Sequence, residues 1–199
     1  MKPESQNLDD YLASDDVVDW RNPEVEGKAL ALAGGTDDQV AKVRILFEWV
    51  RDKVPHTKDI GGDVVTCSAS EVLLQGTGIC MAKSHLLAAL LRANGIPAGF
   101  CYQVLRRDPP HAGMVLHGLN GVYLGGPGKW IRLDPRGNTG TIDARFDGER
   151  EKLAFPMDAG AGEFIYETIF RSPAPVVVKT LRTYTNCEEL WPHLPCSLE

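Results

Sequence analysis

The chain has 199 residues, is 43% hydrophobic and carries a formal net charge of −6 at pH 7. Its size and apolar content suit one globular domain, which we divide into an acidic lead-in over 1–36, a core over about 37–136 and a loop-rich extension over 137–199. The acidic balance argues against nucleic acid or an anionic membrane as a partner, and no apolar run approaches the ~18 residues that a membrane span needs.

The lead-in is predicted to be largely extended, with one short helix. Its first residues are polar and acidic, unlike a secretory signal, so we expect a cytoplasmic protein. Asn22-Pro23 is a typical helix opening and Gly34-Gly35 a typical helix end, which together predict a helix over about 23–33.

Two further helices are predicted before the middle of the chain. The first begins after Thr36, which can cap it, and ends at Pro55. After a loop, Ser68 and Glu71 have the spacing of a capping box and predict a short helix through Leu74. The apolar face of the first of these helices contains Val40, Val43, Leu46, Phe47 and Val50.

The stretch GTGICMAKSHLLAALLRANGIPAGF, which begins at Gly76, predicts a buried helix with a cysteine at its start. Asn94-Gly95 ends this helix and Pro97 prevents it from resuming. Cys80 therefore lies in the first turn, where the helix dipole and the free N–H groups favour a thiolate and can hold an oxyanion. The apolar positions recur at steps of three and four residues: Ile79, Ala82, Leu86, Leu87, Leu90 and Leu91.

After this helix the apolar period changes to two, which predicts strands. Alternation over 100–104 indicates a first strand, and residues 114–124 and 129–133 indicate two more, separated by a glycine-rich turn. Helices followed by an antiparallel sheet predict an α+β fold.

The remaining segments carry weaker signals. Residues 106–110 are expected to form an exposed loop, and the glycine- and charge-rich residues 136–165 are expected to loop over the surface. The β-branched run at 176–178 favours one more strand within 175–184.

A cysteine nucleophile needs a base nearby, and the base needs an orienting acceptor. Three of the five histidines are poorly placed for this role: His85 lies about 140° around the helix from Cys80, His111 lies in a proline-rich loop and His193 lies in the tail. His117 instead lies within a predicted strand.

The hairpin register predicts that an aspartate lies near this histidine. If Leu124 pairs with Lys129, Asp134 is a diagonal neighbour of His117 on the same face of the sheet. Diagonal neighbours lie roughly 7–8 Å apart at Cα, within reach of an imidazole and a carboxylate. His117 and Asp134 can therefore act as a base and its orienter, provided that the central helix brings Cys80 against this face.

This combination resembles the transglutaminase-like superfamily, a branch of the papain-like cysteine enzymes. The matching stretches are AKVRILFEWVRDKV at 41–54, SEVLLQGTGICMAKSHLLAALLRANGIPAGF at 70–100, the histidine at 117 and WIRLDP at 130–135. The resemblance implies a papain-like fold, with Cys80 as nucleophile, His117 as general base and acid, and Asp134 holding the imidazole. It also implies a thioester acyl-enzyme that is resolved by an amine or by water.

Further positions are interpreted through the same resemblance. Gln75 is a candidate side-chain oxyanion donor, because a glutamine upstream of the nucleophile has this role in papain-like enzymes; the backbone N–H of Cys80 is the other candidate. Gly99 replaces an arginine common in relatives and Leu119 replaces an aromatic residue, and both are expected to line the acyl-donor side of the cleft.

We therefore expect an enzyme that performs cysteine-dependent acyl chemistry on a peptide or protein amide bond, without a cofactor. The five cysteines form no C-x-x-C pair and no Cys/His pair has ligand spacing, so reduced thiols and no metal site are expected. Hydrolysis and transfer from a glutamine side chain to an amine share every step up to the thioester, and hydrolysis is favoured because no second-substrate module is apparent. The alternative is a binding or scaffold protein that keeps the fold without turnover. Neither the substrate nor the oligomeric state is indicated.

Overall fold

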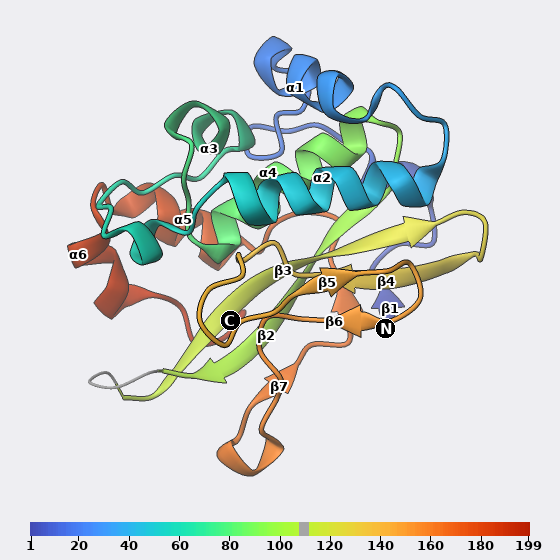
Figure 1. The fold of residues 1–199 in the computed structure, drawn as a ribbon. Helices are drawn as coiled ribbons and strands as arrows, with labels where there is room; N and C mark the ends of the chain where they lie inside the picture. The colour runs from blue at the N-terminus through green and yellow to red at the C-terminus, as the bar shows by residue number, and fades with distance from the viewer. Residues whose placement is uncertain (108–111) are drawn as a thin grey trace.

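A computed structural model describes residues 1–107 and 112–199 of the chain. Helices come first and lie together on one side of a four-stranded antiparallel sheet of order β4-β3-β2-β7 (Figure 1). The predicted α+β class is therefore confirmed. The main elements are α1 (Pro23–Ala33), α2 (Gln39–Lys53), α3 (Ala69–Gln75), α4 (Cys80–Ala93), β2 (Ala98–Arg106), β3 (Met114–Leu124), β4 (Lys129–Leu133) and β7 (Phe164–Ile165).

The helix starts follow from local capping. The Asn22 side chain accepts a backbone N–H at the start of α1, as predicted, and Ser68 and Glu71 form the predicted capping box of α3. The start of α2 differs from the prediction: Asp38, rather than Thr36, is the cap, because its carboxylate accepts two backbone N–H groups of the first turn.

Helix α4 is the centre of the molecule. It packs against α1, α2 and α3 and also against strands β2 and β3, so nearly all of its side chains are buried. The large hydrophobic core lies between these helices and one face of the sheet. A smaller cluster of Tyr11, Cys101, Leu119 and Ile169 lies apart from that core.

The hairpin of β3 and β4 has the predicted register. Leu124 pairs with Lys129, and the ladder continues to the pair of Asn120 and Leu133. Asp134 therefore follows directly after the last paired residue of β4. On its other side β3 pairs with β2 through the whole of its first half.

The C-terminal third is less loop-like than predicted. Residues 137–199 contain further short strands, one of which, β7, extends the main sheet at the free edge of β2. Another, β8, pairs in parallel with the N-terminal strand β1. The additional elements are β1 (Lys2–Pro3), β5 (Arg145–Phe146), β6 (Glu151–Lys152), β8 (Thr168–Ile169), α5 (Pro175–Thr183) and α6 (Cys187–Leu190), with single 3-10 turns at Leu8–Tyr11, Thr57–Ile60, Ala159–Ala161 and Trp191–His193.

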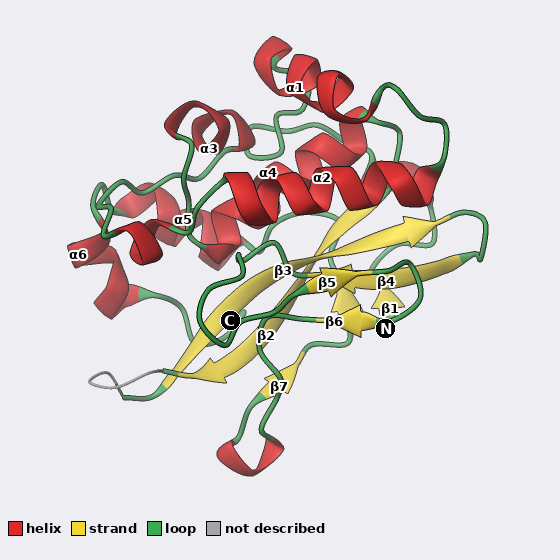
Figure 2. Ribbon diagram, viewed as in Figure 1, coloured by secondary structure: helices red, strands yellow, loops and turns green. Residues whose placement is uncertain are grey.

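The predicted strand within 175–184 is wrong, because this segment forms helix α5 (Figure 2). Pro175 occupies the first turn, where a missing N–H costs nothing. Val177 and Leu181 lie four residues apart and are both buried, so packing outweighs the weak strand preference of the valines.

Two further predictions concern residues 106–111 and membrane-spanning segments. His111 and most of the predicted loop over 106–110 fall in or next to residues 108–111, which lie outside the described residues. In the described part of the chain, no helix combines the length and the apolar character that a bilayer span requires.

Candidate active site

Three residues far apart in the sequence meet at the start of α4. Cys80 is the first residue of that helix, His117 lies in β3 and Asp134 follows the end of β4. The Nε2 atom of His117 lies 2.8 Å from Oδ2 of Asp134, and the Cys80 thiol is close enough to the His117 ring for each group to shift the pKa of the other. Because Nε2 faces the carboxylate, Nδ1 is the ring atom left for the sulfur. The structure thus brings together the three residues that the sequence singled out.

Asp134 is buried and held by several donors. Its Oδ2 accepts the backbone N–H of Ala154 at 3.0 Å as well as the His117 ring, and its Oδ1 accepts the backbone N–H of Arg136 at 3.2 Å. Burial opposes ionisation, but the His117 charge and these hydrogen bonds together lower the pKa of Asp134 below its ordinary value. The carboxylate therefore has both a fixed orientation and a fixed charge.

The charges of Cys80 and His117 depend on each other. Burial alone would raise the pKa of the Cys80 thiol, but the His117 charge and hydrogen bonds to the sulfur lower it well below 9.0. Burial likewise disfavours the charged form of His117, yet Asp134 and Cys80 raise the pKa of His117 to about 10. Both shifts favour a thiolate paired with an imidazolium, which is the reactive form of a cysteine in catalysis.

Close packing of β3 on α4 makes this contact possible. Gly118 follows His117, and a Cβ at position 118 would lie 3.0 Å from Cα of Met81, the residue after Cys80. Only a residue without a side chain lets the strand approach the first turn of α4 so closely.

A cavity of about 300 Å³ opens onto Cys80 and His117. Phe155 packs edge-on against the His117 ring, with centroids 5.0 Å apart. The opposite side contains Trp191 and Leu194 from the C-terminal segment, so both chain segments after the sheet help to form the cleft. The other lining residues are mainly apolar or cationic: Ile79, Met81, Leu105, Val115, Leu116, Pro156, Lys58, Arg106, Arg107 and Arg136, with His56 and Glu163.

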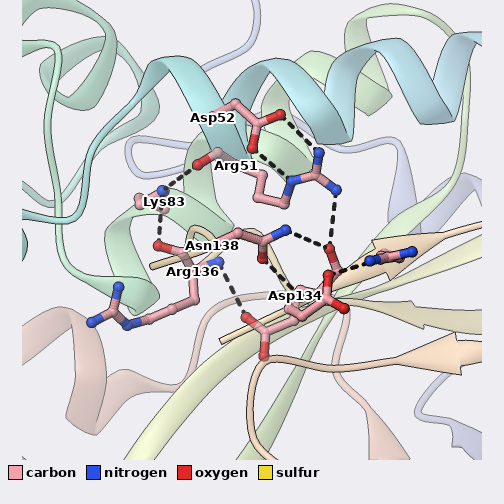
Figure 3. Close-up of polar contacts among 9 residues, drawn as sticks. Arg51, Asp52, Lys83, Asp134, Arg136 and Asn138 are labelled. Atoms are coloured by element: carbon pink, nitrogen blue, oxygen red, sulfur yellow. Dashed lines mark hydrogen bonds and ion pairs between the residues drawn. The ribbon is translucent and has the colours of Figure 1, made fainter. Parts of the chain in front are cut away.

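A buried lysine contacts the loop that follows Asp134 (Figure 3). Lys83, on the second turn of α4, donates to the carbonyl of Arg136 at 3.0 Å and to that of Arg51 at 3.4 Å. Burial lowers the pKa of Lys83 to about 7, and the nearby Arg136 charge acts in the same direction. The loop after Asp134 is thereby linked to α2 and α4.

Three positions interpreted through the family resemblance lie away from the cleft. Gln75 is the exposed last residue of α3 and is not among the described residues that line the cavity. The expectation that Gly99 and Leu119 line the acyl-donor side is wrong. A Cβ on Gly99 would lie 2.6 Å from the carbonyl oxygen of Phe170, which excludes an arginine there, and Leu119 belongs to the smaller apolar cluster.

Three buried thiols elsewhere in the chain have the opposite electrostatic character. Burial raises the pKa of Cys67 and Cys187, and it raises the pKa of Cys101 to about 12. His85, as predicted, faces away from Cys80: its Nδ1 lies 2.7 Å from the carbonyl oxygen of Cys67.

One residue at the site was not anticipated from the sequence. His56 lines the cavity beside Cys80 and contributes, as His117 does, to the lowered pKa of the Cys80 thiol, which therefore has two imidazole neighbours. No local motif marks His56, because a bridge between His56 and Gly78 brings it to the site.

Over residues 1–107 and 112–199, no group of three or more His, Cys, Asp or Glu side chains is arranged to hold a metal ion.

Comparison with known proteins gives a family and a shared fold. Residues 27–135 match the family model of the transglutaminase-like superfamily. Uncharacterized proteins of Mycobacterium bovis and Mycobacterium tuberculosis are 28% identical over 149 residues, which is 68% of this chain and 46% of theirs. The chain thus spans about half the length of these relatives. The crystal structure of a "putative cysteine protease" from Cytophaga hutchinsonii shares the fold, with a TM-score of 0.53 and 21% identity over 66% of this chain and 43% of that one.

Proposed function

Because the chain belongs to the transglutaminase-like superfamily, we propose that it is a cysteine enzyme that acts on amide bonds through a thioester on Cys80. The observation that carries this proposal is that Cys80 and His117 line one open cavity and that His117 is hydrogen-bonded to Asp134. Cys80 is the nucleophile, His117 is the general acid and base, and Asp134 orients the His117 ring and stabilises its charge.

The first half-reaction forms the acyl-enzyme. The Cys80 thiolate attacks the carbonyl carbon, a C–S bond forms, and the carbonyl π electrons move to the oxygen. The cap of α4, Ile79, supplies no side-chain acceptor, so the backbone N–H of Cys80 remains for this oxyanion. Collapse of the adduct breaks the C–N bond, and His117 gives its proton to the departing amine.

The second half-reaction releases the acyl group. His117, now neutral, takes a proton from water as that water attacks the thioester carbonyl. The acid leaves, and the thiolate and imidazolium are restored. We favour water over an amine as the acceptor, which agrees with the name of the Cytophaga protein. The mainly apolar lining of the cavity favours a peptide or protein substrate with an apolar acyl side chain.

The test is to trap the thioester. The protein is mixed with p-nitrophenyl acetate, quenched in acid and mapped by mass spectrometry. We expect acetylation of Cys80 in the wild type and in Cys196→Ser, which removes the exposed cysteine as a control, and none in Cys80→Ala or His117→Ala. Acetylation that is absent from Cys80 in the wild type would contradict the proposal and favour the binding or scaffold alternative.

A further inference from the structure

His56 is the second imidazole at the Cys80 sulfur, and the backbone fixes its position. It forms a parallel bridge with Gly78, two residues before Cys80. The residues that precede the bridge join the same two segments again, because the Thr77 hydroxyl donates to the carbonyl of Pro55 at 2.9 Å. His56 is therefore attached to the segment that leads into α4, and it keeps a fixed distance from the nucleophile.

The hydrogen bonds of His56 determine which ring nitrogen carries the proton. Its Nδ1 accepts the backbone N–H of Lys58 at 3.3 Å and so caps the 3-10 turn that follows. A neutral imidazole has one donor and one acceptor nitrogen, so the hydrogen is on Nε2. Nε2–H is then the donor of the ring in the cavity that His56 and Cys80 both line.

The surroundings keep His56 neutral. Its side chain is buried, and its ring lies nearly parallel to that of Trp191, at an interplanar angle of 16°. Burial, assisted by the Arg136 charge, lowers the pKa of His56 below 6.5. The two imidazoles at the sulfur therefore differ: His117 is charged and exchanges its proton, whereas His56 is a neutral donor.

We propose that His56 is a catalytic residue whose Nε2–H, together with the backbone N–H of Cys80, binds the oxyanion formed when Cys80 attacks an acyl carbonyl. This role rests on the function proposed above. No bond to His56 forms or breaks, and its proton stays on Nε2. In the resting state the His56 N–H donates to the thiolate. As the C–S bond forms, the negative charge moves from the sulfur to the carbonyl oxygen, and the same N–H then donates to that oxygen.

The same contacts argue against His56 as a second base. Its Nδ1 already accepts the Lys58 N–H, so a proton could be added there only if that hydrogen bond were lost. Its Nε2 already carries a hydrogen. The ring can therefore donate a hydrogen bond but has no free site to accept a proton.

The experiment compares two reactions of the same sulfur. Acylation by p-nitrophenyl acetate passes through an oxyanion, whereas alkylation by iodoacetamide does not. His56→Phe keeps an aromatic ring beside Trp191 but removes the donor, and His56→Gln keeps a neutral N–H near the position of Nε2. We expect His56→Phe to acylate about 10²–10³-fold more slowly, and His56→Gln to remain within about tenfold of the wild type. Alkylation of either variant should change by less than about fivefold, because His117 still maintains the thiolate.

Several outcomes would overturn the proposal. One is a His56→Phe variant that acylates at the wild-type rate, and another is an equal loss of acylation and alkylation, which would assign His56 to thiolate formation or folding. A folded His56→Gln variant as slow as His56→Phe would also overturn it. His56→Met serves as the second donor-free variant if thermal unfolding shows that His56→Phe is not folded. If the wild type alkylates at Cys80 but never acylates, the proposed function itself fails and the role of His56 fails with it.

Discussion

At the scale of single residues, Asp134 controls the protonation of His117. The Asp134→Asn variant removes the negative charge while keeping the shape of the side chain. We expect the pKa of His117 to fall from about 10 toward its ordinary 6.5, because the larger of the two charges that oppose the effect of burial is removed. An NMR titration of the His117 ring measures this change directly. A pKa that stays near 10 would show that Asp134 is not the main source of the shift.

Gly118 is a second residue on which the site depends. The Gly118→Ala variant would force β3 away from the first turn of α4, because the new Cβ meets the backbone of Met81. We expect the free energy of unfolding to fall by about 1–3 kcal/mol. Acylation of Cys80 should also slow, because His117 moves with the strand.

The matched control for this change is Gly126→Ala, since a Cβ there meets no atom within 4 Å. Urea unfolding and the rate of p-nitrophenol release test both variants. If Gly118→Ala behaves like Gly126→Ala, close packing at position 118 does not position the site.

At the scale of secondary-structure elements, Lys83 joins α4 to the loop that carries Asp134 (Figure 3). The Lys83→Met variant leaves the carbonyl of Arg136 without this donor. We expect a loss of about 1–3 kcal/mol in the free energy of unfolding, together with slower acylation. Lys179→Met, on the exposed side of α5, is the control and should change neither quantity. Equal stabilities of the two variants, measured by urea unfolding, would contradict the claim that Lys83 stabilises the loop that carries Asp134.

The elements that could be predicted from the sequence are those with a strong local signal. Helices α1 and α3 have clear caps, and β3 and β4 have clear alternation, so their bounds agree closely with the prediction. The strands β7 and β8 have only two residues each, too few to show a period, and they form because β2 offers an edge to β7 and β1 pairs with β8. Helix α5 differs from the prediction because the prediction gives more weight to the strand preference of the three valines than to the four-residue spacing of Val177 and Leu181, the two residues that the helix buries.

The residues of the candidate site also differ in how well the sequence predicts them. Cys80, His117 and Asp134 could be predicted because a helix start and a hairpin register relate them. His56 could not, since its place depends on a bridge between two irregular segments. Gln75 remains an untested prediction, although its exposed position at the end of α3 separates it from the cavity.

At the scale of the whole molecule, the C-terminal segment forms one wall of the cleft. Arg107 holds this wall, donating to the carbonyls of Trp191 at 2.9 Å and Leu194 at 3.1 Å. We expect Arg107→Met to raise KM for a peptide ester roughly fivefold with kcat nearly unchanged, because ground-state and transition-state contacts are lost alike. Steady-state kinetics measure KM and kcat separately. A fall in kcat at constant KM would instead show that the C-terminal segment contributes to the chemical step.

The pH dependence of Cys80 alkylation tests the central claim, that Cys80 is a thiolate paired with His117. Labelling with iodoacetamide, mapped at all five cysteines, should reach half of its maximum at Cys80 well below pH 9, because the imidazolium stabilises the thiolate as the pH falls. This stabilisation should persist until His117 loses its proton near pH 10, and His117→Ala should return the half-point toward 9. Uniform slow labelling of all five cysteines, or a wild-type half-point near 9, would contradict the account.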